Sequence, residues 1–128
     1  MIKKKVREAM TNSSVTDSEI RSAENYLKGY GLNRKLLRLD RYEREYMGYK
    51  ENEETPLGDI PLARAKMFEI RHFIMELENS DEKLLLYYHY VRGEPVEKCA
   101  ELLGISRSSG FRLKKKALIL AAEQRKKA

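Results

Sequence analysis

The residues best suited to chemistry form a basic run at positions 106–116, SRSSGFRLKKK. The guanidinium of Arg112 can donate two hydrogen bonds to a guanine edge, and the ring of Phe111 can contact a thymine methyl group. Ser106 and Ser109, with the backbone amides at the start of a helix, suit a phosphate. These residue types indicate DNA recognition. The predicted DNA-binding residues are Ser106, Arg107, Ser108, Ser109, Phe111, Arg112, Lys114, Lys115 and Lys116.

Helical spacing sorts this run into two faces. Four apolar or small positions are predicted to face inward, namely Gly110, Leu113, Ala117 and Leu120. The outward face holds the residues expected to enter a major groove, and the flanking Lys114 and Lys116 are expected to meet backbone phosphates. The alternative is an amphipathic helix with a solvated polar face, packed in a helical bundle.

The charge distribution supports a polyanionic partner. The chain has 26 Lys and Arg residues against 20 Asp and Glu residues, a net charge of +6. Residues 106–128 alone hold eight Lys and Arg residues against the single acid Glu123, a net charge of 8 − 1 = +7. Such a basic segment favours nucleic acid or an anionic membrane surface, although a solvated basic tail would have the same composition.

A tight turn between two helices precedes the basic run. Residues 95–103, PVEKCAELL, begin with a proline and place their apolar side chains on one face. Gly104 permits a left-handed backbone, and Ser106 can cap the next helix, which is expected from residue 107 to beyond residue 120. Small Ala100 lets the two helices cross closely. This spacing of Ala100, Gly104 and Ser106 is typical of a helix-turn-helix.

The block from residue 80 to about residue 120 resembles region 4 of the sigma-70 family. The similarity lies in an apolar-aromatic helix ending at Gly93, a short helix over residues 96–103, the LGIS turn and the Arg-containing helix that follows. Gly110 stands where the family usually has Val or Ile, and Phe111 where it often has a DNA-facing Arg. The layout of the whole chain is similar to phage late transcription regulators of the ArpU and RinA kind. The resemblance implies binding to promoter DNA.

The remaining chain is predicted to be all-α. A flexible tail is expected at 1–15, a helical hairpin at 16–47, a polar linker at 48–60 and a linking helix at 61–79. The hairpin begins with a capping box at Thr16 and Glu19, and turns at Gly29 and Gly31 before a second helix capped by Asn33. The helix-turn-helix domain is expected at 80–122 and a basic tail at 123–128.

Tyrosines suggest where protein partners could bind. Tyr42, Tyr46 and Tyr49 could form a protein-binding surface on the hairpin, or pack against the helix after it. The hairpin would then serve as a homodimer interface or as a contact to RNA polymerase. In residues 87–90, YYHY, the tyrosines are more consistent with core packing than with a polymerase contact.

Several function classes are excluded by the sequence. The two histidines, His72 and His89, lack metal-ligand spacing, so no metal or cofactor is expected. There is no phosphate-cradling glycine loop, and the carboxylates are spread over helix surfaces, so no catalytic residues are predicted and the protein is not expected to be an enzyme. Cys99 falls on the inner face of a short helix, so it is expected to be a buried structural thiol and not a nucleophile. A single cysteine and the absence of a long apolar run predict a cytoplasmic protein without a membrane partner.

Together these features predict a sequence-specific DNA-binding transcription regulator, encoded by a bacterial phage or prophage. Double-stranded DNA is the expected partner. One alternative is a phage small terminase subunit that binds packaging DNA, because such subunits also combine a helix-turn-helix with helical oligomerisation elements. Another is an adaptor of the anti-sigma type, which would contact RNA polymerase and not DNA.

Overall fold

The computed structural model describes residues 15–50, 53 and 60–127, and every regular element in these ranges is a helix. The all-α prediction is therefore confirmed for the described residues. The elements are α2 (Asp17–Tyr46), α3 (Ile60–Met75), α4 (Ser80–Leu86), the π-helix η1 (Tyr87–Val91), α5 (Val96–Leu103) and α6 (Arg107–Lys127). The predicted flexible tail, apart from Val15, and most of the polar linker lie outside the described residues.

Helix α2 is one continuous helix of 30 residues, so the predicted hairpin within residues 16–47 is wrong. The capping box is present: the Glu19 amide donates to Thr16 Oγ1 at 3.1 Å, and the Thr16 amide donates to Glu19 Oε1 at 2.8 Å. Asn33 does not cap a second helix, because its side-chain amide donates to the carbonyl oxygen of Gly29 within α2. Gly29 instead faces α3: a Cβ added there would lie 3.4 Å from Ile70 Cδ1.

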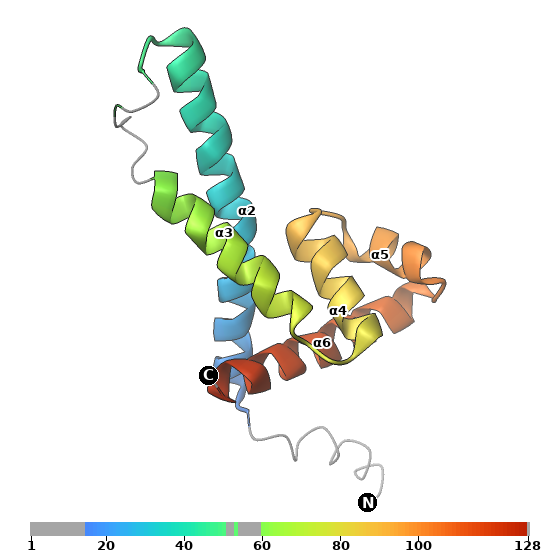
Figure 1. Ribbon diagram of the computed structural model, residues 1–128. Coiled ribbons are helices and arrows are strands. Elements are labelled where there is room, and N and C mark those ends of the chain that lie inside the picture. Colours follow the sequence, from blue (N-terminus) through green and yellow to red (C-terminus); the bar gives the residue numbers. More distant parts are fainter. Residues whose placement is uncertain (1–14, 51–52, 54–59, 128) are drawn as a thin grey trace, which may run out of the picture.

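The helical hairpin of this protein is formed by α2 and α3, which lie antiparallel (Figure 1). The buried side chains of α3 are Ile60, Ala63, Ile70 and Ile74. Tyr26 packs edge-on against Phe73, with ring centroids 5.3 Å apart, and its hydroxyl donates to Glu69 at 2.7 Å. The predicted linking helix at 61–79 thus ends earlier, at Met75, and packs along α2.

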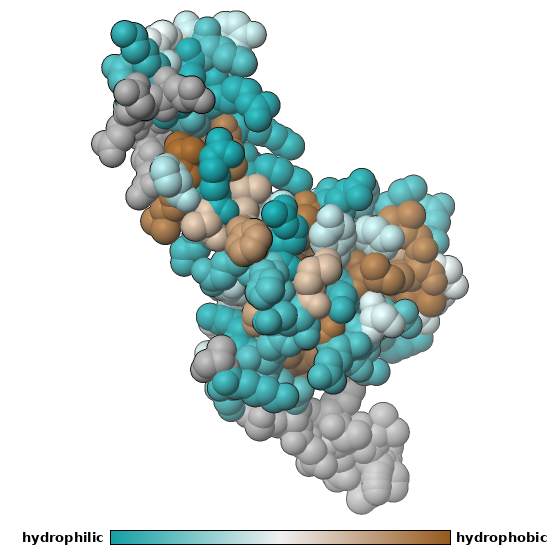
Figure 2. Space-filling model, in the orientation of Figure 1, coloured by the Kyte–Doolittle hydropathy of each residue, from teal (hydrophilic) through white to brown (hydrophobic). Residues whose placement is uncertain are grey.

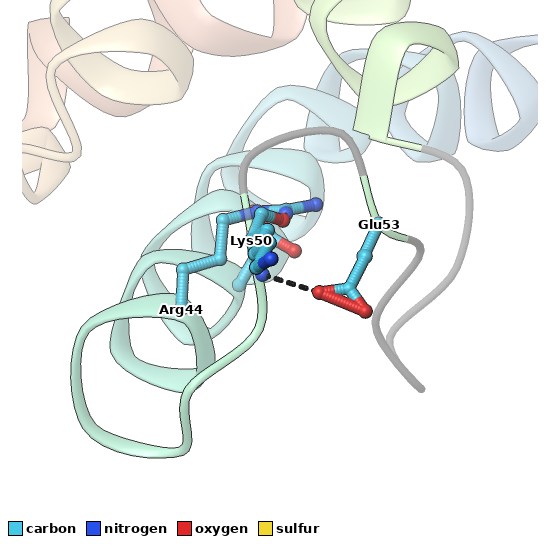
Figure 3. Close-up of polar contacts among 4 residues, drawn as sticks. Arg44, Lys50 and Glu53 are labelled. Carbon is cyan, nitrogen blue, oxygen red and sulfur yellow. Dashed lines mark hydrogen bonds and ion pairs between the residues drawn. The ribbon is translucent and has the colours of Figure 1, made fainter.

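The far end of this hairpin is held by polar contacts after α2 (Figure 3). Arg44 pairs with the buried Asp40 at 2.9 Å and also donates to the carbonyl oxygen of Lys50. The Lys50 amide in turn donates to Glu53 Oε1 at 2.8 Å. The chain leaving α2 is therefore tied back to the helix.

The carboxyl-terminal helices share one core with the hairpin. Leu27 of α2, Ile74 of α3, Leu85 of α4 and Ala121 of α6 are all fully buried in the same cluster. The buried core residues from the four later helices are Leu85, Leu86, Tyr90, Val91, Cys99, Ala117, Leu118, Ala121 and Ala122. Residues 80–122 are thus packed onto α2 and α3 and do not stand apart as a module.

The predicted basic tail at 123–128 is wrong for the residues described, because α6 remains helical to Lys127. Arg125 donates to Ser22 Oγ at 3.0 Å and lies over the ring of Tyr26, with its Cζ 4.9 Å from the ring centre. Gln124 donates to the carbonyl oxygen of Phe73 at 2.9 Å. These contacts fix the end of α6 beside the start of α2, as Figure 1 shows.

The aromatic segment after α4 widens into the π-helix η1. Arg34 of α2 donates to the carbonyl oxygen of Val91 at 2.9 Å, which satisfies an acceptor at the end of η1. Tyr90 is buried and donates to Glu24 at 2.7 Å, so the core role predicted for this tyrosine is confirmed. Among the described residues, no helix is long and apolar enough to cross a membrane.

Candidate functional site

The turn between α5 and α6 has the backbone geometry expected from its sequence. Gly104 ends α5 in the left-handed region, with φ at +73°, and the Ile105 amide donates to the carbonyl oxygen of Ala100 at 2.9 Å. Ser106 then caps α6, because its Oγ accepts from the Ser109 amide at 3.1 Å. The chain therefore reverses over three residues, and α6 starts at the surface.

The two helices cross where Gly110 meets Ala100. A Cβ added to Gly110 would lie 2.8 Å from the Cβ of Ala100 and 3.5 Å from Val96 Cγ1. Contacts as short as the first do not occur between real methyl groups, so only glycine fits at this distance. The inward orientation predicted for Gly110 is thus confirmed, and the opposite face of α6 turns outward.

That outward face presents a group of side chains near the start of α6. Ser106, Arg107, Ser108, Phe111 and Arg112 line one shallow surface depression. The side chain of Phe111 is 44% exposed, and the Arg107 guanidinium lies 5.6 Å from the centre of its ring. The half-exposed ring of Phe111 can contact an apolar group of a ligand, while the guanidinium groups of Arg107 and Arg112 can pair with its anionic groups.

Arg112 and the serines form a small polar network on this face. Arg112 Nη2 donates to Ser109 Oγ at 3.0 Å, and Ser106 Oγ lies 3.0 Å from the same oxygen. The network holds the guanidinium against α6 while leaving the residue exposed. Ser106 and Ser109 therefore act first as a cap and as a support for Arg112.

An acidic residue on α5 opposes part of the basic face. Glu97 Oε2 lies 3.2 Å from Arg107 Nε, and both side chains are largely exposed. The backbone N–H of Glu97 at the start of α5, followed by Arg107, holds the pKa of this carboxyl below its usual value. Glu97 is thus ionised near neutral pH and offsets the charge of Arg107.

The three consecutive lysines fall into different environments. Lys115 is exposed, whereas Lys114 pairs with Glu24 of α2 at 3.4 Å. Lys116 pairs at 3.2 Å with a carboxylate of α4 that is buried. The structure therefore brings Lys115 to the same stretch of exposed helix as Arg112, while its two neighbours join α6 to other helices.

The partners of these lysines were not identified from the sequence. Glu24 and Glu82 lie 90 and 34 positions before the lysines that they meet. Spacing along one helix gives no signal for such pairs, because they depend on how the helices pack. For Glu82 the sequence offered one signal of such a pairing, namely an acidic residue in the first turn of α4 that is followed by apolar residues.

The described residues contain no group of three or more His, Cys, Asp or Glu side chains that could hold a metal ion. Cys99 is buried, and burial raises the pKa of its thiol, which makes the thiolate less available. Exposed Leu102 and Ile105 lie beside the turn, and Figure 2 shows apolar side chains gathered over this end of the molecule.

No family model, curated protein or solved structure matches this chain.

Proposed function

We propose that the chain binds double-stranded DNA through the amino-terminal half of α6, with α5, the turn and α6 acting as a helix-turn-helix. The observation that carries the proposal is the exposed group of Arg107, Phe111 and Arg112 on one side of α6. Gly110 on the other side allows α5 to approach α6 closely, which leaves the basic side facing outward. A helix presented in this way fits a major groove.

The proposed roles follow from the environment of each side chain. Arg112 reads a base edge, since it is exposed and its guanidinium donates to the hydroxyl of a neutral serine, Ser109, and not to a carboxylate among the described residues. Phe111 contacts a thymine methyl, and Lys115 meets a phosphate. Arg107 meets a phosphate after exchanging its partner Glu97 for the DNA backbone. Lys114 and Lys116, although still basic, contribute chiefly to the field around α6.

Transcription regulation is the proposed biological role, and a promoter is the proposed target. This step is supported by the resemblance of residues 80–120 to sigma-70 region 4, and it leaves the sense of regulation open. A regulator encoded by a phage or prophage is consistent with the short helical layout. The polymerase-adaptor alternative predicts no duplex binding, whereas the small-terminase alternative predicts a ring-shaped oligomer that the mass in solution would reveal.

The test begins with a selection of duplexes from a randomised pool by the full-length protein. Binding of the selected duplex and of a scrambled duplex is then measured by fluorescence anisotropy at several salt concentrations. Arg112→Ala should lower affinity for the selected duplex by about 1–3 kcal/mol and affect the scrambled duplex much less. Lys115→Ala should weaken both duplexes and reduce the slope of log affinity against log salt by about 0.9.

The matched control is Arg64→Ala, which removes an exposed arginine from α3 on the hairpin. It makes the same change in net charge, and it should leave both affinities nearly unchanged. Equal effects of Arg112→Ala and Arg64→Ala would show that α6 is not the recognition helix. If the wild-type protein binds neither duplex at low salt, the proposal is wrong and the adaptor alternative gains support.

A further inference from the structure

A regular exposed face runs along the second half of α2, whose end projects beyond the other helices (Figure 1). Its members are spaced alternately by three and four residues: Leu32, Lys35, Leu39, Tyr42 and Tyr46. Leu32 is 61% exposed, Leu39 53% and Tyr46 70%. This spacing keeps side chains in one stripe along a helix and is the spacing with which helices pack in coiled coils.

The core of the hairpin does not use this stripe. The structure buries Tyr30, just before the stripe, and Asp40, which is paired with Arg44 on that inner side. The rings of Tyr42 and Tyr46 pack on each other, with centroids 4.8 Å apart, and both stay more than half exposed. The tyrosines therefore do not serve the packing of α2 on α3, which was one of the two roles that the sequence allowed.

We propose that the stripe is the interface with a second copy of this chain, in which the two α2 helices pack antiparallel about a two-fold axis. The alternation then places Leu39 opposite Tyr42 of the partner subunit. Lys35 lies opposite Tyr46 of the partner subunit, where an ammonium can rest on a ring face. A two-fold interface repeats each contact, so every such pair occurs twice.

Charges beside the stripe favour the antiparallel arrangement. Arg38 and Glu45 are both exposed and occupy equivalent positions, each directly before an interface residue on the same side of the stripe. In an antiparallel pair of helices these positions face each other, so Arg38 meets Glu45 of the partner subunit. A parallel pair in register would instead place Lys35 against Lys35 of the partner subunit, which is repulsive. The stripe is therefore self-complementary in one orientation only.

Dimerisation through α2 does not depend on DNA binding, because the stripe and the exposed face of α6 lie on different helices. It does bear on how DNA would be bound. A two-fold dimer carries two copies of α6, and two copies suit a target made of two related half-sites.

Sedimentation equilibrium of the full chain, from micromolar to near-millimolar concentration, measures the dimer directly. Arg38→Glu turns two attractions into two repulsions and should weaken dimerisation about tenfold. Glu45→Arg should do the same. The double variant Arg38→Glu/Glu45→Arg restores both pairs with reversed sign and should return the dissociation constant to within about threefold of the wild type.

Arg41→Glu is the matched control, since Arg41 is exposed on the same stretch of α2 but outside the stripe and its flanks. It makes the same charge change as Arg38→Glu and should leave dimerisation unaltered. Circular dichroism melting of each variant confirms that it is folded. A wild-type chain that stays monomeric over the whole range, a double variant as weak as the single ones, or an equal effect of Arg41→Glu would each overturn the proposal.

Discussion

Replacing Gly110 by alanine tests the close crossing of α5 and α6. In helices generally alanine is more favourable than glycine by about 1 kcal/mol, so the change would stabilise an open site. Here the added Cβ would lie 2.8 Å from the Cβ of Ala100, so the two helices must separate. Such overpacking costs about 1–3 kcal/mol, and the expected net change is a loss of about 1 kcal/mol.

Gly31→Ala is the internal reference, because a Cβ there would meet no atom within 4 Å. It should gain up to about 1 kcal/mol, so the two variants should differ by about 2 kcal/mol. Urea unfolding followed by circular dichroism at 222 nm, a standard wavelength for helix content, gives both values from the shift of the midpoint. In the double variant Ala100→Gly/Gly110→Ala the clash is removed, and part of the loss should be recovered.

A Gly110→Ala variant stabilised as much as Gly31→Ala would contradict the close crossing of α5 and α6. Additive effects of Ala100→Gly and Gly110→Ala would contradict it too, because the two methyl positions would then not be in contact.

Three further outcomes are expected. A fragment of residues 75–128 should be largely unfolded by circular dichroism, because the inner face of α6 packs on α2 in the shared core; a cooperatively melting fragment would contradict this. Glu97→Gln should raise affinity for a scrambled duplex at low salt, because it removes the anion paired with Arg107; unchanged or weaker binding in anisotropy would contradict this. Partial burial acts to raise the pKa of Glu24, but the hydrogen bond from Tyr90 and the nearby lysines lower it overall. Ionised Glu24 therefore stabilises the fold above its unfolded pKa, near 4.5. This contribution is lost as pH falls through the lower folded pKa. Between about pH 6 and pH 3 the wild type should therefore lose more stability than Glu24→Gln, and equal losses in urea titrations would refute this assignment.

Local chemistry in the sequence was sufficient to place several elements. The capping box at Thr16 and Glu19, the left-handed Gly104 and the cap at Ser106 all depend on residues within a few positions of each other. Local backbone and cap interactions determine such features almost independently of the rest of the fold. The start of α6 and the turn before it could therefore be predicted.

The continuity of α2 could not be predicted in the same way. Two glycines close together are a good signal of a helix end, but α2 continues through Gly29 and Gly31, and Gly29 packs beside Ile70 of α3. A glycine that ends a helix and one that lies within a packed helix look the same in the sequence. Gly29 and Ile70 are 41 positions apart, and tertiary packing of this kind overrides helix propensity.

Only part of the candidate site could be predicted, because helical spacing says nothing about contacts between helices. Helical spacing separated the inward Gly110 from the outward Phe111 and Arg112, and the structure agrees. Spacing could not show that Lys114 and Lys116 point to acids on α2 and α4, because it contains no information on the neighbours of α6. The effective basic surface is therefore smaller than the count of lysines and arginines suggests.

DNA binding by the exposed start of α6 can be mapped from the amide chemical shifts of the protein during titration with the selected duplex. We expect the largest changes on residues 106–115, with smaller ones on the start of α5 near Glu97. Amides of the projecting half of α2 should change little beyond the effect of added salt. Changes concentrated on α2 and α3, with residues 106–115 unaffected, would contradict DNA binding through α6.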